Sequence, residues 1–64
     1  MNKRQLNRIF EVFFDCKFAL SFNKSNATWA WHSRHSTPDM EDFRFKTALE
    51  AMEDATEPYF NPGE

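Results

Sequence analysis

The sequence predicts a small α+β domain in which an antiparallel β-hairpin packs against one C-terminal helix. Three observations lead to this prediction. Apolar residues alternate with other residues from Phe10 to Phe22 and again over residues 27–35, which is the pattern of strands with one buried face. A polar break at residues 23–26 separates the two runs and is typical of a hairpin turn. Residues 47–57 carry apolar side chains at helical spacing.

The length and composition indicate one compact unit over residues 1–64. A chain of 64 residues buries a modest fraction of its surface, so its stability depends on bulky core residues. Eight Phe, two Trp and one Tyr supply that bulk, because each aromatic side chain buries about 150–250 Å². The single cysteine excludes an internal disulfide, and no apolar run approaches the roughly 18 residues of a membrane span. We therefore expect a soluble cytoplasmic protein.

The N-terminal residues 1–9 are expected to form a polar segment or a short helix. Leu6, Ile9 and Phe10 would share one face of such a helix among polar neighbours. The helical pattern runs on through Phe13, however, and overlaps the strand predicted over residues 10–22. The boundary between helix and strand is therefore left open.

The register of the hairpin follows from matching both faces of its two strands. Pairing Phe22 with Ala27 places apolar residues opposite aromatic residues on one face and polar or small residues opposite each other on the second face. A shift by one residue would turn both Trp side chains toward water. The predicted pairs on the apolar face are Leu20 with Trp29 and Phe18 with Trp31.

Residues 36–46 admit two interpretations. In the first, Thr37 caps a long helix that has Pro38 in its first position. In the second, which we favour, residues 36–41 form a loop or a single turn and residues 42–46 form a short third strand.

The C-terminal helix is predicted to begin with a capping box formed by Thr47 and Glu50. It is predicted to end at Glu57, because a residue that precedes proline avoids the helical region. Residues 58–64 then form a tail. The helical spacing directs Leu49 and Met52 toward the sheet, and Glu50, Glu53 and Asp54 toward solvent.

No catalytic or metal-binding motif can be recognised. The only glycine, Gly63, lies in the tail, so there is no loop to cradle a phosphate. His32 and His35 would point to opposite faces of a strand, and Cys16 shares only the parity of His35, so four zinc ligands do not converge. Cys16 with His35 also lacks the orienting group that a nucleophile needs. We expect a protein that is not an enzyme and that has no catalytic residue, metal or cofactor.

The excess of aromatic residues favours a protein-interaction module. One short helix cannot cover every ring on a small sheet, and uncovered aromatic surface on a small chain commonly becomes an interface. We expect the protein to bind a larger protein and to modulate it, for example as an inhibitor of the accessory type that phages and mobile elements encode. The residues expected at this interface are Phe13, Trp29, Trp31, Arg34, Phe43, Glu50, Glu53 and Asp54.

The distribution of charge suggests two further functions. Residues 1–35 hold six Lys and Arg against two acids, whereas residues 36–64 hold two against eight. The alternative function is therefore the binding of single-stranded nucleic acid, in which Trp rings stack on bases. The cations expected there are Lys17, Lys24, His32 and Arg34. We rank this alternative lower, because both Trp residues have the parity of the core.

The acids of the predicted helix could also compete with nucleic acid for a basic groove on a host enzyme, although the net charge of −2 is small for a mimic. Self-association as a homodimer is a further alternative. A membrane partner is not expected.

Overall fold

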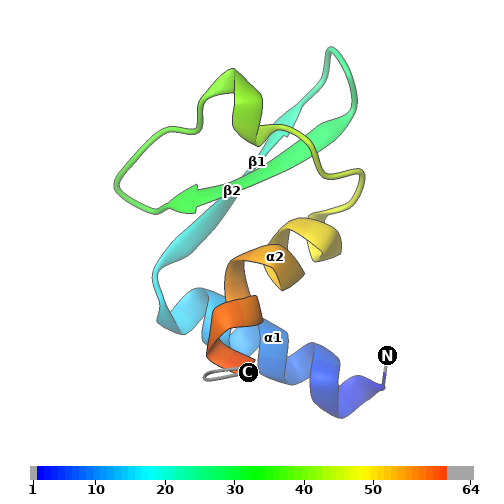
Figure 1. Ribbon diagram of the computed structural model, residues 1–64, viewed down its shortest axis with the longest axis vertical. Helices are drawn as coiled ribbons and strands as arrows, with labels where there is room; N and C mark the ends of the chain where they lie inside the picture. The colour runs from blue at the N-terminus through cyan, green and yellow to red at the C-terminus, as the bar shows by residue number, and fades with distance from the viewer. Residues whose placement is uncertain (1, 61–64) are drawn as a thin grey trace.

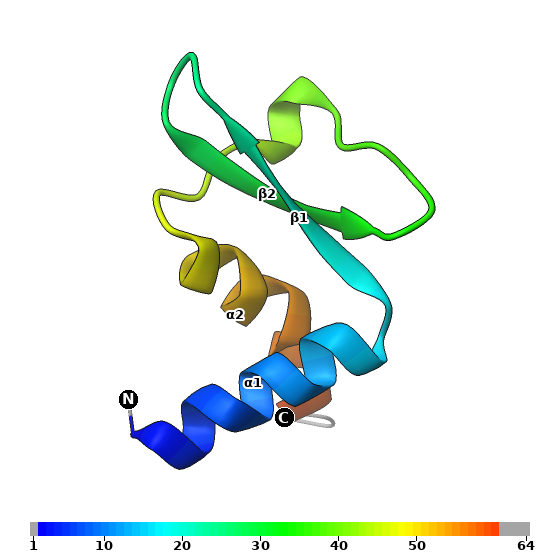
Figure 2. The same ribbon diagram turned by 180° about the vertical axis from the view of Figure 1, so that it is seen from behind.

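The computed structural model describes residues 2–60 of the chain. Two strands form one antiparallel sheet, and both helices lie on the same side of it (Figure 1). The segment with a short 3-10 turn passes on the other side of the hairpin, as the view from behind also shows (Figure 2). This arrangement confirms the predicted α+β class with a C-terminal helix on a hairpin. The elements are α1 (Lys3–Asp15), β1 (Phe18–Asn23), β2 (Thr28–Ser33), the turn η1 (Met40–Asp42) and α2 (Ala48–Phe60).

Helix α1 is the main departure from the sequence prediction. The strand predicted over residues 10–22 is wrong in its first part, because α1 continues to Asp15 and β1 begins only at Phe18. The buried residues of α1 are Ile9 and Phe13, which lie four apart and therefore on one helical face. That face packs on α2. The Phe-rich run fits the alternating pattern of a strand and the spacing of a helix equally well, and burial of this face against α2 favours the helix.

Both ends of α1 are defined by local hydrogen bonds. The Asn2 side chain accepts a hydrogen bond from the backbone N–H of Gln5 at 2.9 Å, and the Gln5 side chain accepts one from the Asn2 N–H at 3.3 Å. This reciprocal pair is a capping box and satisfies two donors of the first turn. At the other end, Lys17 adopts a φ of 60° and turns the chain into β1.

The hairpin keeps its predicted faces, but its register differs from the prediction by two residues. Phe22 pairs with Trp29 rather than with Ala27, and Leu20 pairs with Trp31. The turn therefore lies one residue further along the chain than predicted. Because the shift is an even number of residues, each side chain remains on the face assigned to it.

The core lies between the two helices and one face of the hairpin. The Phe13 ring packs against the Phe18 ring with their centroids 5.6 Å apart, and the Phe18 ring lies 5.1 Å from that of Trp31. Thr56 is completely buried, and its hydroxyl donates to the Met52 carbonyl at 2.9 Å, which avoids an unsatisfied polar group. The central cluster consists of Ile9, Phe13, Met52 and Ala55, with Phe18, Leu20 and Trp31 packed against it.

The third strand predicted over residues 42–46 is reduced to a single β-bridge between Phe45 and Trp29. The Trp29 N–H donates to the Phe45 carbonyl at 2.6 Å, and the Phe45 N–H donates to the Trp29 carbonyl at 3.2 Å. The long helix capped by Thr37 does not form. The favoured interpretation, a loop followed by a short edge segment, therefore holds in a reduced form.

Helix α2 begins after Thr47 as predicted and ends later than predicted; of the predicted capping box, the described residues show only the bond to the Thr47 hydroxyl. The Thr47 hydroxyl accepts a hydrogen bond from the Glu50 N–H at 3.1 Å and caps the first turn. The predicted end at Glu57 is wrong, because the helix continues through Pro58 to Phe60. Proline is costly in the middle of a helix, but here only two helical residues follow it. Residues 61–64 of the predicted tail lie outside the described residues.

Candidate protein-interaction surface

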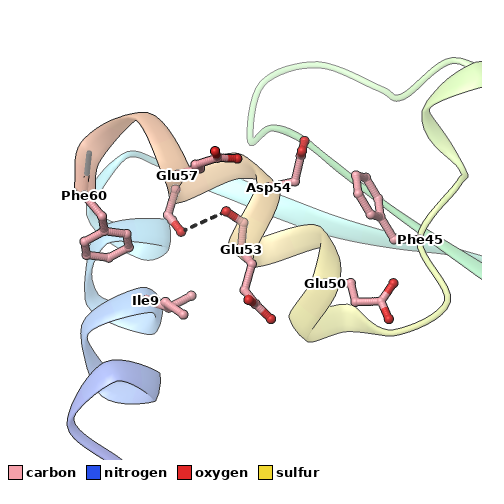
Figure 3. A pocket seen from close by; sticks show the side chains of 8 residues that line it. Ile9, Phe45, Glu50, Glu53, Asp54, Glu57 and Phe60 are labelled. Atoms are coloured by element: carbon pink, nitrogen blue, oxygen red, sulfur yellow. Dashed lines mark hydrogen bonds between the residues drawn. The ribbon is translucent and has the colours of Figure 1, made fainter. Parts of the chain in front are cut away.

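An open groove of about 480 Å³ runs along one side of α2 (Figure 3). Phe45 lies at one end of this groove, and Ile9 and Phe60 lie at the other. Between these apolar ends the lining is acidic. The carboxylates that line it, all from α2, belong to Glu50, Glu53, Asp54 and Glu57.

The three glutamates of the groove are exposed and follow one side of the helix. They are spaced three and four residues apart, so that successive turns of α2 each present a carboxylate. Within residues 2–60, the only ion pair joins Arg44 to Asp54. Glu50, Glu53 and Glu57 therefore have no cationic partner in the part of the chain that the structure describes. The groove is a region of uncompensated negative charge.

Asp54 differs from the glutamates beside it. Its Oδ2 atom accepts a hydrogen bond from the Trp31 indole N–H at 2.9 Å and lies 3.5 Å from the Arg44 guanidinium. The same guanidinium lies over the Phe45 ring, 4.8 Å from its centroid. The prediction that Asp54 faces solvent holds only in part, because its side chain is 38% exposed while its carboxylate joins α2 to β2 and to the segment before α2.

Several large apolar side chains are exposed outside the groove. Phe14 of α1 is 59% exposed, and Phe22 at the end of β1 is 47% exposed. Phe10 lies one turn before Phe14 on α1 and is also exposed. Exposed aromatic rings of this kind are frequent at protein interfaces.

Tyr59 lies near the C-terminal end of α2 and is exposed. A hydrogen bond with the side chain of Cys16, together with the charge interaction between the two groups, raises the pKa of the Tyr59 hydroxyl.

The aromatic residues predicted at the interface are less accessible than expected. Phe13 is 1% exposed and belongs to the core, so it is not available as a surface anchor in this fold. Trp31 is half-buried and bound to Asp54. Trp29 is half-buried against the Phe22 ring, with the centroids 4.9 Å apart, and Phe43 is half-buried as well.

The predicted charged residues do not all come together. Glu50 and Glu53 lie in the groove, whereas exposed Arg34 follows β2 and does not line it. Three apolar residues that line the groove are not among the predicted site residues: Ile9, Phe45 and Phe60. Their place at the ends of the groove depends on contacts between elements, so no local pattern indicates it. Glu57 could have been included from its spacing to Glu53.

The cations predicted for nucleic-acid binding are dispersed over the hairpin. Lys17 and Arg34 are neighbours, because the Arg34 N–H donates to the Lys17 carbonyl at 2.9 Å, but Lys24 lies in the turn at the far end. His32 lies on the face opposite Trp31, and its Nε2 is 2.8 Å from the Ser21 hydroxyl. The hairpin therefore does not combine its Trp rings and these cations in one stacking platform.

Among residues 2–60, no group of three side chains is arranged to hold a metal ion. No helix in this part of the chain is long and apolar enough to cross a membrane. Comparisons with protein-family models, with curated proteins and with solved structures found no match. The geometry of the groove and of the exposed rings is therefore the basis for assigning a function.

Proposed function

We propose that the protein is a small, non-enzymatic interaction module that binds a larger protein and modulates it, with the groove along α2 as part of the contact. The observation that carries this proposal is the groove itself, in which three glutamates without a cationic partner among the described residues lie between apolar ends. Binding energy at interfaces concentrates in a few apolar anchors surrounded by polar groups. The groove offers both kinds of group, with its acids on α2 and its apolar residues on α1, on α2 and on the segment before α2.

The exposed rings of α1 and β1 support the same proposal. Phe14 and Phe22 lie outside the groove and would enlarge the contact area beyond it. A stable interface commonly involves about 20–30 residues on each partner, whereas eight residues line the groove. A partner would therefore also contact at least one of the neighbouring aromatic surfaces.

The character of the groove favours binding over catalysis. Its three glutamates are exposed to water, and its lining contains no cysteine, lysine or histidine that could act as a nucleophile or base beside them. Acid–base catalysis benefits from a site that excludes water and holds the reacting groups in place. An open groove of this kind is better suited to a peptide chain.

The test is affinity capture of the protein's partner from a lysate of its source organism, with and without nuclease, followed by mass spectrometry. An unrelated small acidic protein on the same resin controls for nonspecific capture through charge. We expect one stoichiometric protein that is absent from the control and survives nuclease. Recovery that disappears with nuclease would favour the alternative of nucleic-acid binding, and the absence of any specific protein would refute the proposal.

A further inference from the structure

We infer that the groove along α2 binds a short cationic segment of the partner protein, with two or three Lys or Arg residues flanked by apolar side chains. This inference rests on the proposed function and adds the chemistry of the partner. The charge of the groove and the apolar residues at both of its ends together define the occupant.

The charge of the groove selects for cations. Glu50, Glu53 and Glu57 line it, and among residues 2–60 none of them forms an ion pair. Arg44, which lies over the Phe45 ring of the groove, is already held by Asp54. A cationic segment would pair with exposed carboxylates that form no ion pair within residues 2–60, whereas an acidic segment or a phosphate backbone would be repelled.

The spacing of the carboxylates fits a peptide. With a helical rise of about 1.5 Å per residue, Glu53 and Glu57 are about 6 Å apart along the axis, and Glu50 and Glu57 about 10.5 Å. In an extended chain, side chains at alternate positions lie on the same side and are about 6.6 Å apart. Two cations at alternate positions therefore match Glu53 and Glu57, and a third reaches Glu50 through its flexible side chain.

The ends of the groove explain the apolar flanks. Phe45 lies beyond Glu50 at one end, and Ile9 and Phe60 lie beyond Glu57 at the other (Figure 3). An apolar side chain two positions beyond the outer cation at either end, and therefore on the same side of the extended chain, would contact one of these apolar groups. Burial of these contacts adds affinity that depends little on salt, in contrast to the charge pairs.

The test uses a fluorescein-labelled nonapeptide with leucine at both ends and arginine at positions three, five and seven, the remaining positions being serine, so that all five side chains share one side of the extended chain. Binding to the full chain is followed by fluorescence anisotropy at low salt. We expect saturable binding that weakens when the leucines are replaced by serine. No binding is expected when the arginines are replaced by glutamate.

The decisive comparison is between two variants with the same change in net charge. Glu53→Gln with Glu57→Gln removes two charges from the groove and should weaken peptide binding about three- to thirtyfold. Glu11→Gln with Glu41→Gln removes two exposed charges that do not line the groove, and affinity should change less than about twofold. Circular dichroism is used to check that both variants are folded. Equal losses in the two variants, or no saturable binding to the unmodified protein, would overturn the inference.

Two further outcomes separate this inference from the proposed function. If the Glu53→Gln/Glu57→Gln variant captures the lysate partner as well as the unmodified protein does, the groove is not the binding site, although the protein remains an interaction module. A second copy of the chain could also supply cations, since α1 carries Lys3, Arg4 and Arg8. A dimeric mass in light scattering that becomes monomeric in the groove variant would assign the groove to self-association and refute a separate partner.

Discussion

Replacement of Asp54 by alanine tests how α2 is held against the rest of the protein. The Asp54 carboxylate accepts the hydrogen bond from the Trp31 indole at 2.9 Å and pairs with Arg44 at 3.5 Å. These contacts join three parts of the chain that lie far apart in the sequence. Asp54→Ala removes both of them and leaves the Trp31 N–H without its acceptor.

The size of the effect follows from the exposure of the groups. A hydrogen bond to a charged group contributes about 1.5–3 kcal/mol, and the lower end applies because the Asp54 side chain is 38% exposed. The ion pair adds about 0–1 kcal/mol, since the Arg44 side chain is 60% exposed. The better helix propensity of alanine offsets about 0.5 kcal/mol. The expected loss in the free energy of unfolding is therefore about 1.5 kcal/mol.

A loss of this size is large for so small a protein. A domain of 64 residues has a free energy of unfolding of about 3–10 kcal/mol. The melting temperature should fall by about 6–12 °C, at about 4–8 °C for each kcal/mol. Asp54→Asn keeps an acceptor for the indole but loses the charge, so its effect should be about half as large.

Urea denaturation followed by Trp fluorescence measures these losses directly. Arg44→Ala is the matched control, because it removes the exposed ion pair and the contact with the Phe45 ring but keeps the Trp31 hydrogen bond. It should cost about 0.5–1 kcal/mol. An Asp54→Ala variant within 0.5 kcal/mol of the unmodified protein, or less destabilised than Arg44→Ala, would refute this account of how α2 is fixed.

Three further predictions concern local structure. Ala27 has a φ of 55° and is exposed, so Ala27→Gly relieves a left-handed conformation and should stabilise the protein by about 0.5 kcal/mol in thermal unfolding; a lower melting temperature would contradict this. Thr47→Ala removes the hydroxyl that caps α2 and should cost about 1 kcal/mol in urea denaturation, whereas Thr47→Ser should retain most of the stability. The interaction with Cys16 raises the pKa of Tyr59, so the Tyr59 absorbance change should occur at a higher pH than in free tyrosine and move back toward it in Cys16→Ala. Because the pKa of Tyr59 is raised in the folded state, the interaction with Cys16 contributes to the free energy of unfolding at a pH below the pKa of the unfolded chain. This contribution is lost as the pH rises through the pKa of the folded state.

Much of the hairpin could be predicted from the sequence, because alternation fixes which face of a strand each side chain occupies. Trp31, Leu20 and Phe18 face the helices as expected. The register could not be fixed to better than two residues, since the turn has no Asn-Gly signal and both registers preserve the same faces. The observed register decides which pair each Trp makes.

Helix α1 shows why local periodicity was insufficient. Between Phe10 and Phe14 three of five residues are Phe, so an alternating pattern and a helical pattern are both satisfied. The choice depends on packing of Ile9 and Phe13 against α2, which is a contact between the two ends of the sequence. Such a contact cannot be read from a local window.

Only the part of the candidate site that depends on local spacing could be predicted from the sequence. Helical spacing alone places Glu50 and Glu53 on the outer side of α2, where the structure has them. The role of Asp54 could not be predicted from helical spacing, because it depends on the Trp31 indole of β2 lying within hydrogen-bond distance of this turn of α2. Phe45 enters the groove only because a single bridge to Trp29 brings its segment alongside.

The measurement that tests the central claim most directly is hydrogen exchange of the protein alone and in its nuclease-resistant complex with the captured partner. If the groove is part of the contact, amides of α2 over residues 48–60 should exchange more slowly in the complex than in the free protein. Slower exchange confined to the hairpin, with α2 unchanged, would contradict the assignment of the groove as the binding surface.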